Sequence, residues 1–227
     1  MNIKRGRFDQ IETVDSKPAT NILDHFKAAL PERFVKYDNA CRGDALNYDL
    51  YGVDPEQDVA VVQVRHSFRR YRNGFLNQHK TYVLCGFNEL TKLPFRHPVG
   101  AAAVRASIRR DPTDPAAPVR AAQRWMWEVT ERQLASGIRQ GDVLLVPERG
   151  QPKVAKEIGP QHTVGQSHEI RAARVVVTID GRVWAFSPSV WHSKNQHDPI
   201  FADHEGWHSV RVAREEMAWN FSVRLGD

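Results

Sequence analysis

The sequence predicts an α+β fold, with helices in the N-terminal and middle parts and a small antiparallel β-sheet or partly open barrel in the C-terminal half. Apolar residues recur at helical spacing near the N-terminus and again around residue 125. Runs rich in β-branched residues begin at Asp58 and become the main pattern after Gly137. Turn dipeptides separate several of these runs, which favours antiparallel hairpins over parallel crossovers.

Three regions follow from this pattern. Residues 1–17 are polar and charged without periodicity, which predicts an N-terminal arm. Residues 18–138 are expected to form an α+β region with an arginine-rich hairpin and helices. Residues 139–227 are expected to be rich in β structure and to pack with the preceding region as one domain. The 41% hydrophobic content of the 227-residue chain is ordinary for a globular protein and excludes wholesale disorder.

Three segments have the character of helices. The first starts near Asn21, because apolar residues from Ile22 to Leu30 recur at helical spacing before Pro31 interrupts them. Residues 100–110 combine high helix propensity with an arginine-rich end. Residues 119–135 carry an apolar stripe and are expected to form one continuous helix. The last segment, residues 214–225, favours a closing helix, although its alternation also fits a strand.

The strand-like runs begin with residues 58–65 and 79–87, which are expected to pair as a hairpin. Their connection contains Asn73-Gly74, a turn dipeptide. Asp180-Gly181 is a second one, in the C-terminal part. The strands expected there are residues 141–147, 173–179, 182–186 and 207–213.

Positive charge is concentrated in the middle of the chain. Residues 61–125 contain 12 lysines and arginines against 3 carboxylates, whereas the regions before and after are close to neutral or slightly acidic. Ten of those 12 cations are arginine, which binds phosphate and carboxylate groups bidentately. The charge pattern therefore indicates that one part of the protein contacts an anionic partner, more than it indicates a general property of the whole protein.

Arginines and aromatic residues alternate in the segment RHSFRRYRNGF, residues 65–75. Guanidinium groups engage phosphates, and aromatic rings stack on unpaired bases. We therefore expect a contact patch for RNA or single-stranded DNA within a larger assembly. Its residues are Arg65, Arg69, Arg70, Tyr71, Arg72 and Lys80.

Other interpretations of this patch stay open. The same residues would suit an acidic protein surface. They would also be ordinary solvated cations if the acidic N-terminal segment pairs with them. No zinc-finger spacing, RNP motif or KH-type loop is present, so the signal is physical and not tied to a known motif.

Histidines are concentrated in the C-terminal half, where neutral imidazoles could bind a divalent transition metal. Nearby carboxylates, including Glu169, Asp198, Asp203 and Glu205, would complete a mixed shell. This predicts a metal-binding β-domain or metal-dependent enzyme as an alternative function. The candidate ligands are His168, His192, His197, His204 and His208.

Several classes of function lack their sequence signatures. No HExxH motif, CxxC pair or glycine-rich nucleotide loop is present, so no cofactor beyond a possible divalent metal is expected and a non-catalytic protein is favoured. A purely structural subunit, assembling with itself or with a larger complex, is a third alternative. Without a membrane span or apolar signal segment, and with only Cys41 and Cys85 as thiols, we expect a cytoplasmic protein that does not contact membranes.

Four pieces of the C-terminal region resemble an uncharacterised bacterial family. They are QGDVLLVP (140–147), VGQSHEI (164–170), HDPI (197–200) and EGWHSVRVAREE (205–216). That family is similar in having a Gly-His-x-His segment followed by His-x-Pro-Ile and a Gly-aromatic strand. The resemblance covers about the last 90 residues and implies a shared small β fold without an established activity. His168 and His197 match the pattern, whereas Gln166 stands in place of its first histidine.

Overall fold

The computed structural model describes residues 19–31, 41–70, 76–88, 91–165, 167–194, 198–214 and 216. The chain divides into two compact units. We call Met1–Trp125 with Glu215–Gly226 the N-terminal unit and Met126–Arg214 the C-terminal unit. β-structure dominates both units, so the α+β prediction holds in its coarse form, but the protein is mostly β, with short helices.

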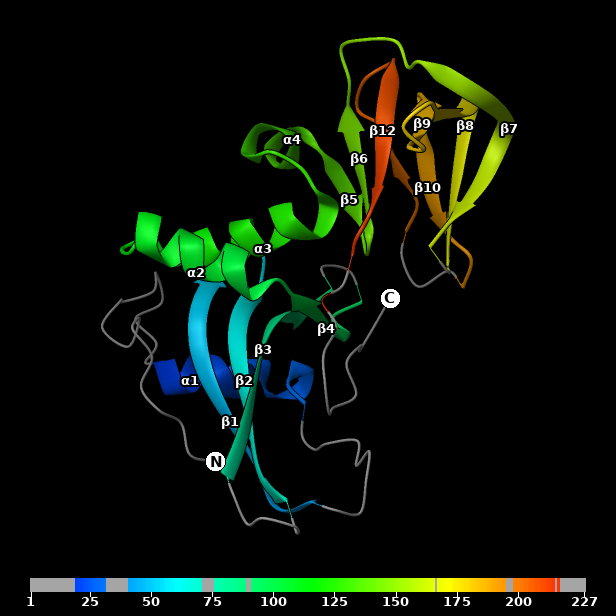
Figure 1. Cartoon of the computed structure of the whole chain (residues 1–227). Coiled ribbons are helices and arrows are strands. Elements are labelled where there is room, and N and C mark those ends of the chain that lie inside the picture. The colour runs from blue at the N-terminus through cyan, green and yellow to red at the C-terminus, as the bar shows by residue number, and fades with distance from the viewer. Residues whose placement is uncertain are drawn as a thin grey trace. The chain divides into compact units, whose positions relative to one another are not determined.

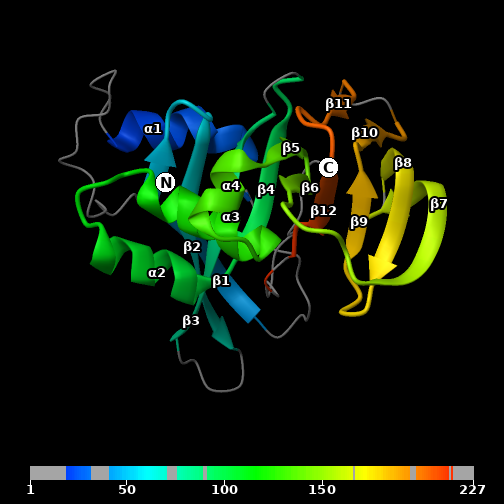
Figure 2. The ribbon, with the colours of Figure 1, turned by 90° about the horizontal axis from the view of Figure 1, so that it is seen from above.

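The N-terminal unit is built on a four-stranded antiparallel meander with the strand order β1-β2-β3-β4. Short helical segments precede the sheet and two helices follow it. The bounds are α1 (Ala19–His25), η1 (Phe26–Ala29), β1 (Cys41–Asp54), β2 (Val59–Arg70), β3 (Leu76–Phe87), β4 (Pro94–Val99), α2 (Ala101–Arg110) and α3 (Ala117–Trp127). Figure 2 shows α1 on one face of the sheet and α2 on the other.

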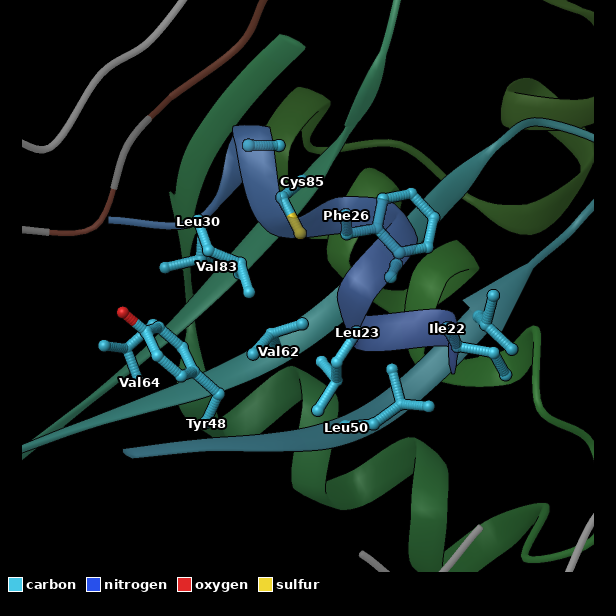
Figure 3. Packing of buried hydrophobic residues seen from close by; sticks show 13 residues of the cluster. Ile22, Leu23, Phe26, Leu30, Tyr48, Leu50, Val62, Val64, Val83 and Cys85 are labelled. Atoms are coloured by element: carbon cyan, nitrogen blue, oxygen red, sulfur yellow. The ribbon is translucent and has the colours of Figure 1, made fainter. Parts of the chain in front are cut away.

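Strict alternation along β2 explains how the sheet is covered on both faces. Ala60, Val62 and Val64 belong to the core cluster that also contains Phe26 and Leu23 of α1 and η1 (Figure 3). The residues between them point to the opposite face, where they are equally buried. A strand that is apolar on both faces belongs in the middle of a layered structure, which is where β2 lies.

Gly52 allows a close contact between β1 and the segment before α3. The backbone N–H of Val53 donates to the Pro115 carbonyl at 2.9 Å. A Cβ atom on Gly52 would lie 2.8 Å from that carbonyl oxygen and 2.8 Å from side-chain atoms of Pro118. Only glycine therefore fits at this position without moving the neighbouring chain.

The C-terminal unit is a curled, nearly closed sheet with the path β11-β10-β8-β9-β12-β6-β5. β7 pairs with β8 outside this path. The bounds are α4 (Glu131–Ser136), β5 (Ile138–Gln140), β6 (Val143–Pro147), β7 (Val154–Val164), β8 (His168–Thr178), β9 (Val183–Phe186), β10 (Ser189–His192), β11 (Ile200–Phe201) and β12 (Trp207–Val212).

Closure of this sheet is assisted by a side chain at the end of its path. The Gln140 amide of β5 donates to the backbone carbonyl of Asp198, just before β11. Aliphatic residues from six strands fill the interior, including Leu145, Ile170 and Val190. The barrel is thus a packed core like that of other small barrels.

The continuous helix expected over residues 119–135 is instead two helices, α3 and α4. Glu128 adopts a left-handed backbone conformation, with φ of 54°, which ends α3. Thr130 then starts α4 with a capping box, in which its hydroxyl accepts from the Gln133 backbone and the Gln133 side chain accepts from the Thr130 backbone. None of the helices in the described part of the chain has the length and apolar character needed to cross a membrane.

Candidate nucleic-acid interface

Arginines of two strands occupy paired backbone positions at one end of the N-terminal sheet. Arg69 and Arg70 are the last residues of β2, and the strand register places Arg42 opposite Arg69 and Cys41 opposite Arg70. Figure 1 shows this end of β2 and β3 extending away from α2. We call it the hairpin end, defined by residues 41–42, 65–70 and 76–80. Tyr71 and Arg72, also predicted for the patch, lie outside the described residues.

The register also decides which cations share a face of the sheet. Arg65 lies on the face of β2 that also carries Val61 and Gln63. Lys80 of β3 stands directly opposite Arg65, so it belongs to that face too, and it is exposed. This is the face that α2 covers further along the sheet.

Arg65 itself is engaged within the fold. Its Nη2 donates to Asp49 Oδ1 at 3.1 Å and its Nε lies 2.9 Å from Asp49 Oδ2, so the two side chains form an ion pair with one hydrogen bond. The two side chains are only 12% and 15% exposed. One of the predicted contact residues is therefore paired with a carboxylate from the acidic N-terminal part and stabilises the sheet.

The buried Tyr82 and the half-buried Tyr51 lie beside these cations on the same face. Tyr51 and Tyr82 pack edge to face with ring centroids 4.9 Å apart, and the Gln63 amide donates to the Tyr82 hydroxyl at 2.7 Å. Burial, together with the hydrogen bond and charge interaction with Tyr51, raises the pKa of Tyr82 to about 12. Tyr82 is therefore a neutral part of the sheet at physiological pH, and Arg105 of α2 lies close enough to lower that pKa slightly.

The predicted metal ligands are only partly brought together. His168 and His192 are cross-strand partners on β8 and β10, both buried, with ring centroids 5.0 Å apart. Nδ1 of His192 accepts from the Lys194 backbone N–H at 3.2 Å, so its lone pair is already used. His204 is exposed in a loop, and His197 lies outside the described residues. Within those residues, no group of three or more His, Cys, Asp or Glu side chains could hold a metal ion.

His208 is buried in the barrel, where its Nδ1 donates to the Gly206 carbonyl oxygen at 3.1 Å. Burial lowers the pKa of His208 below its usual 6.5, and the charge of His204 lowers it further. The hydrogen bond to the Gly206 carbonyl and the nearby carboxylates raise this pKa, but by less. The folded state therefore binds a proton at this site less readily than the unfolded state does.

His208 should consequently weaken the fold in acid. Above pH 6.5 His208 is neutral and does not lower the free energy of unfolding. As the pH falls from about 6.5 through the lower pKa that His208 has in the folded state, the free energy of unfolding should decrease. We expect His208→Gln to lose less stability than the wild type between pH 7 and pH 5, measured by urea unfolding at each pH. His162→Gln controls for loss of one histidine from the same unit; equal pH slopes for wild type and His208→Gln would contradict the expectation.

A second group of arginines and aromatic residues lies on the outside of the barrel. The Arg171 guanidinium carbon is 4.4 Å from the ring centroid of Trp191, and Arg174 packs at 5.7 Å against Trp207. Both arginines are paired with glutamates of the same unit, Glu169 and Glu157 respectively. Their charge is largely neutralised, so this surface has less attraction for an anion than the hairpin end.

No protein-family model matches the chain, and no curated protein and no solved structure matches it either.

Sequence reasoning missed two residues that lie beside the predicted patch in the strand pairing, Arg42 and Asp49. Both lie on β1, a 14-residue strand that the sequence did not reveal because glycine, aspartate and asparagine interrupt its apolar pattern. Their proximity to Arg69 and Arg65 depends on a strand register that no local signal contains.

Cys85 is fully buried, and burial raises the pKa of its thiol to about 12, so its role is packing.

Proposed function

We propose that the N-terminal unit binds single-stranded nucleic acid, RNA or DNA, at the hairpin end. The observation that carries the proposal is the register of β1 and β2, which sets Arg42 directly opposite Arg69 with Arg70 next to them. Like charges placed opposite each other on a sheet destabilise it by a few tenths of a kcal/mol, roughly, unless an anion compensates them. A phosphate backbone supplies such an anion.

Aromatic residues in the same segment favour nucleic acid over an acidic protein. Phe68 lies on β2 between the arginines, and Tyr71 and Phe75 follow in the sequence. Rings of this kind stack on unpaired bases and contribute about 1–3 kcal/mol per base, whatever the base is. Binding without strong sequence preference and with strong salt dependence is the expected behaviour.

The direct test is fluorescence anisotropy with labelled RNA and DNA single strands of about a dozen nucleotides, using the full chain. In Arg69→Ala/Arg70→Ala, we expect affinity at ~0.1 M salt to fall about tenfold. The slope of log K against log salt should become shallower by about 1.4, the value for two lost phosphate contacts on a single strand. A slope unchanged by this variant would overturn the proposal.

A matched control removes the same charge elsewhere. Arg149→Ala/Lys153→Ala replaces two exposed cations of the C-terminal unit and should leave both affinity and slope close to the wild type. If the control loses as much as Arg69→Ala/Arg70→Ala, then binding follows total charge and the hairpin end has no special role. Absence of any oligonucleotide binding by the wild type would favour an acidic protein partner instead.

A further inference from the structure

Helix α2 begins beside the part of β3 that leads to the hairpin end. Val99, the last residue of β4, pairs with Tyr82 of β3, and α2 starts two residues later. Val104 and Ile108 of α2 are buried, and the helix packs on β3. Its exposed side carries Arg105 and Arg109, which are one helical turn apart and therefore neighbours on the helix surface.

The cations along this route are exposed and have no internal counterion within the described residues, as is also true of several other exposed cations. Among the residues that the structure describes, Lys80, Arg105 and Arg109 form no ion pair with a carboxylate. Three carboxylates of the same unit are already engaged, since Asp49 holds Arg65, Asp111 holds Arg110 and Asp114 holds Arg120. Exposed cations left over in this way give a surface its net attraction for a polyanion.

These cations also follow one another in space in an order that a single strand of nucleic acid could follow. From Leu76, which pairs with Arg69, β3 runs through Lys80 to Tyr82, a distance of about 20 Å at the usual rise of a strand. Arg105 then lies near Tyr82, and Arg109 follows about 6 Å further along the helix. A single nucleic-acid strand with phosphates ~3.4 Å apart or more would cover the part along β3 with about six nucleotides or fewer.

We propose that a bound single strand continues from the hairpin end along β3 onto α2, with Lys80, Arg105 and Arg109 contacting its phosphates. This inference rests on the proposed function and extends it from a local patch to a track. Lys80, Arg105 and Arg109 are single cations spaced along a line. A ligand that contacts all three needs a flexible anionic backbone, and single-stranded nucleic acid has one. Contacts to phosphates, with no base readout from α2, make this part of the site independent of sequence.

The test compares Arg105→Ala/Arg109→Ala with the wild type on the same labelled single strands of about a dozen nucleotides. Affinity at ~0.1 M salt should fall about tenfold and the salt slope should become shallower by about 1.4, since two phosphate contacts are lost. Arg105→Lys/Arg109→Lys keeps both charges and should retain the wild-type slope. Both arginines are exposed, so thermal melting should show that each variant is folded.

The result separates the extended track from the site at the hairpin end. If Arg69→Ala/Arg70→Ala weakens binding but Arg105→Ala/Arg109→Ala behaves like the control Arg149→Ala/Lys153→Ala, then the track is wrong while the proposed function survives. If neither arginine pair matters, both are wrong. Loss in both variants, with the slope restored by the lysine pair, supports the track.

Discussion

Replacement of Phe26 by alanine should destabilise the protein by about 3–5 kcal/mol, the range measured when a fully buried phenylalanine is truncated. Phe26 is 2% exposed and belongs to the core cluster between η1 and the sheet (Figure 3). Its ring stacks on Phe87 with centroids 6.0 Å apart and meets His25 edge-on at 4.9 Å. Alanine would remove these contacts and leave a cavity that the β-sheet cannot close.

Urea unfolding measures this effect, with Phe201→Ala as the matched control. Phe201 is 61% exposed on β11, so the same truncation should change the free energy of unfolding by less than about 1 kcal/mol. Phe26→Leu keeps most of the apolar volume and should have an intermediate effect, which provides a measurement if the alanine variant does not fold. A cost for Phe26→Ala no greater than that for Phe201→Ala would show that the η1 packing is wrong.

Asp49→Ala should cost about 3 kcal/mol, because it removes the partner of a largely buried guanidinium. The Arg65 side chain is 12% exposed and is paired with the Asp49 carboxylate, so little solvent is available to compensate for loss of that carboxylate. An uncompensated buried charge is penalised far more than the net contribution of the intact pair. The predicted loss is therefore one of stability, even though Arg65 lies beside the proposed binding residues.

An exposed pair of the same unit provides the comparison. Arg110 and Asp111 are 62% and 41% exposed, and Arg110→Ala should change stability by only about 0–1 kcal/mol. Asp49→Leu/Arg65→Met removes both charges and should recover much of the stability lost in Asp49→Ala. If the single and double variants are equally unstable, then charge burial is not the cause.

Local sequence signals predicted much of the secondary structure. The apolar spacing from Ile22 to Leu30 corresponds to α1 and η1, and β2, β3, α2, β6, β8, β9 and β12 lie where strands and a helix were expected. Asp180-Gly181 forms the expected turn, with Gly181 at φ of 79°. These features depend on short-range spacing or on turn chemistry, both of which a single sequence contains.

What the sequence did not reveal depends on long-range packing. β1 and β7 were missed because polar residues and glycine interrupt their alternation, and they are strands only because a neighbour pairs with them. The break at Glu128 requires a left-handed conformation that glutamate does not favour. For the candidate site, composition predicted the arginine patch, but only the fold reveals that Arg65 is paired and Arg42 is adjacent.

The register of β2 restricts how this protein could change over evolution. A slip of β2 by one residue would move every side chain of the strand to the other face of the sheet. The same slip would turn Val62 and Val64 out of their layer, which the fold would not tolerate. The apolar residues of β2, together with the pairing of Arg65 with Asp49, therefore keep the strands aligned and resist any insertion or deletion within this strand.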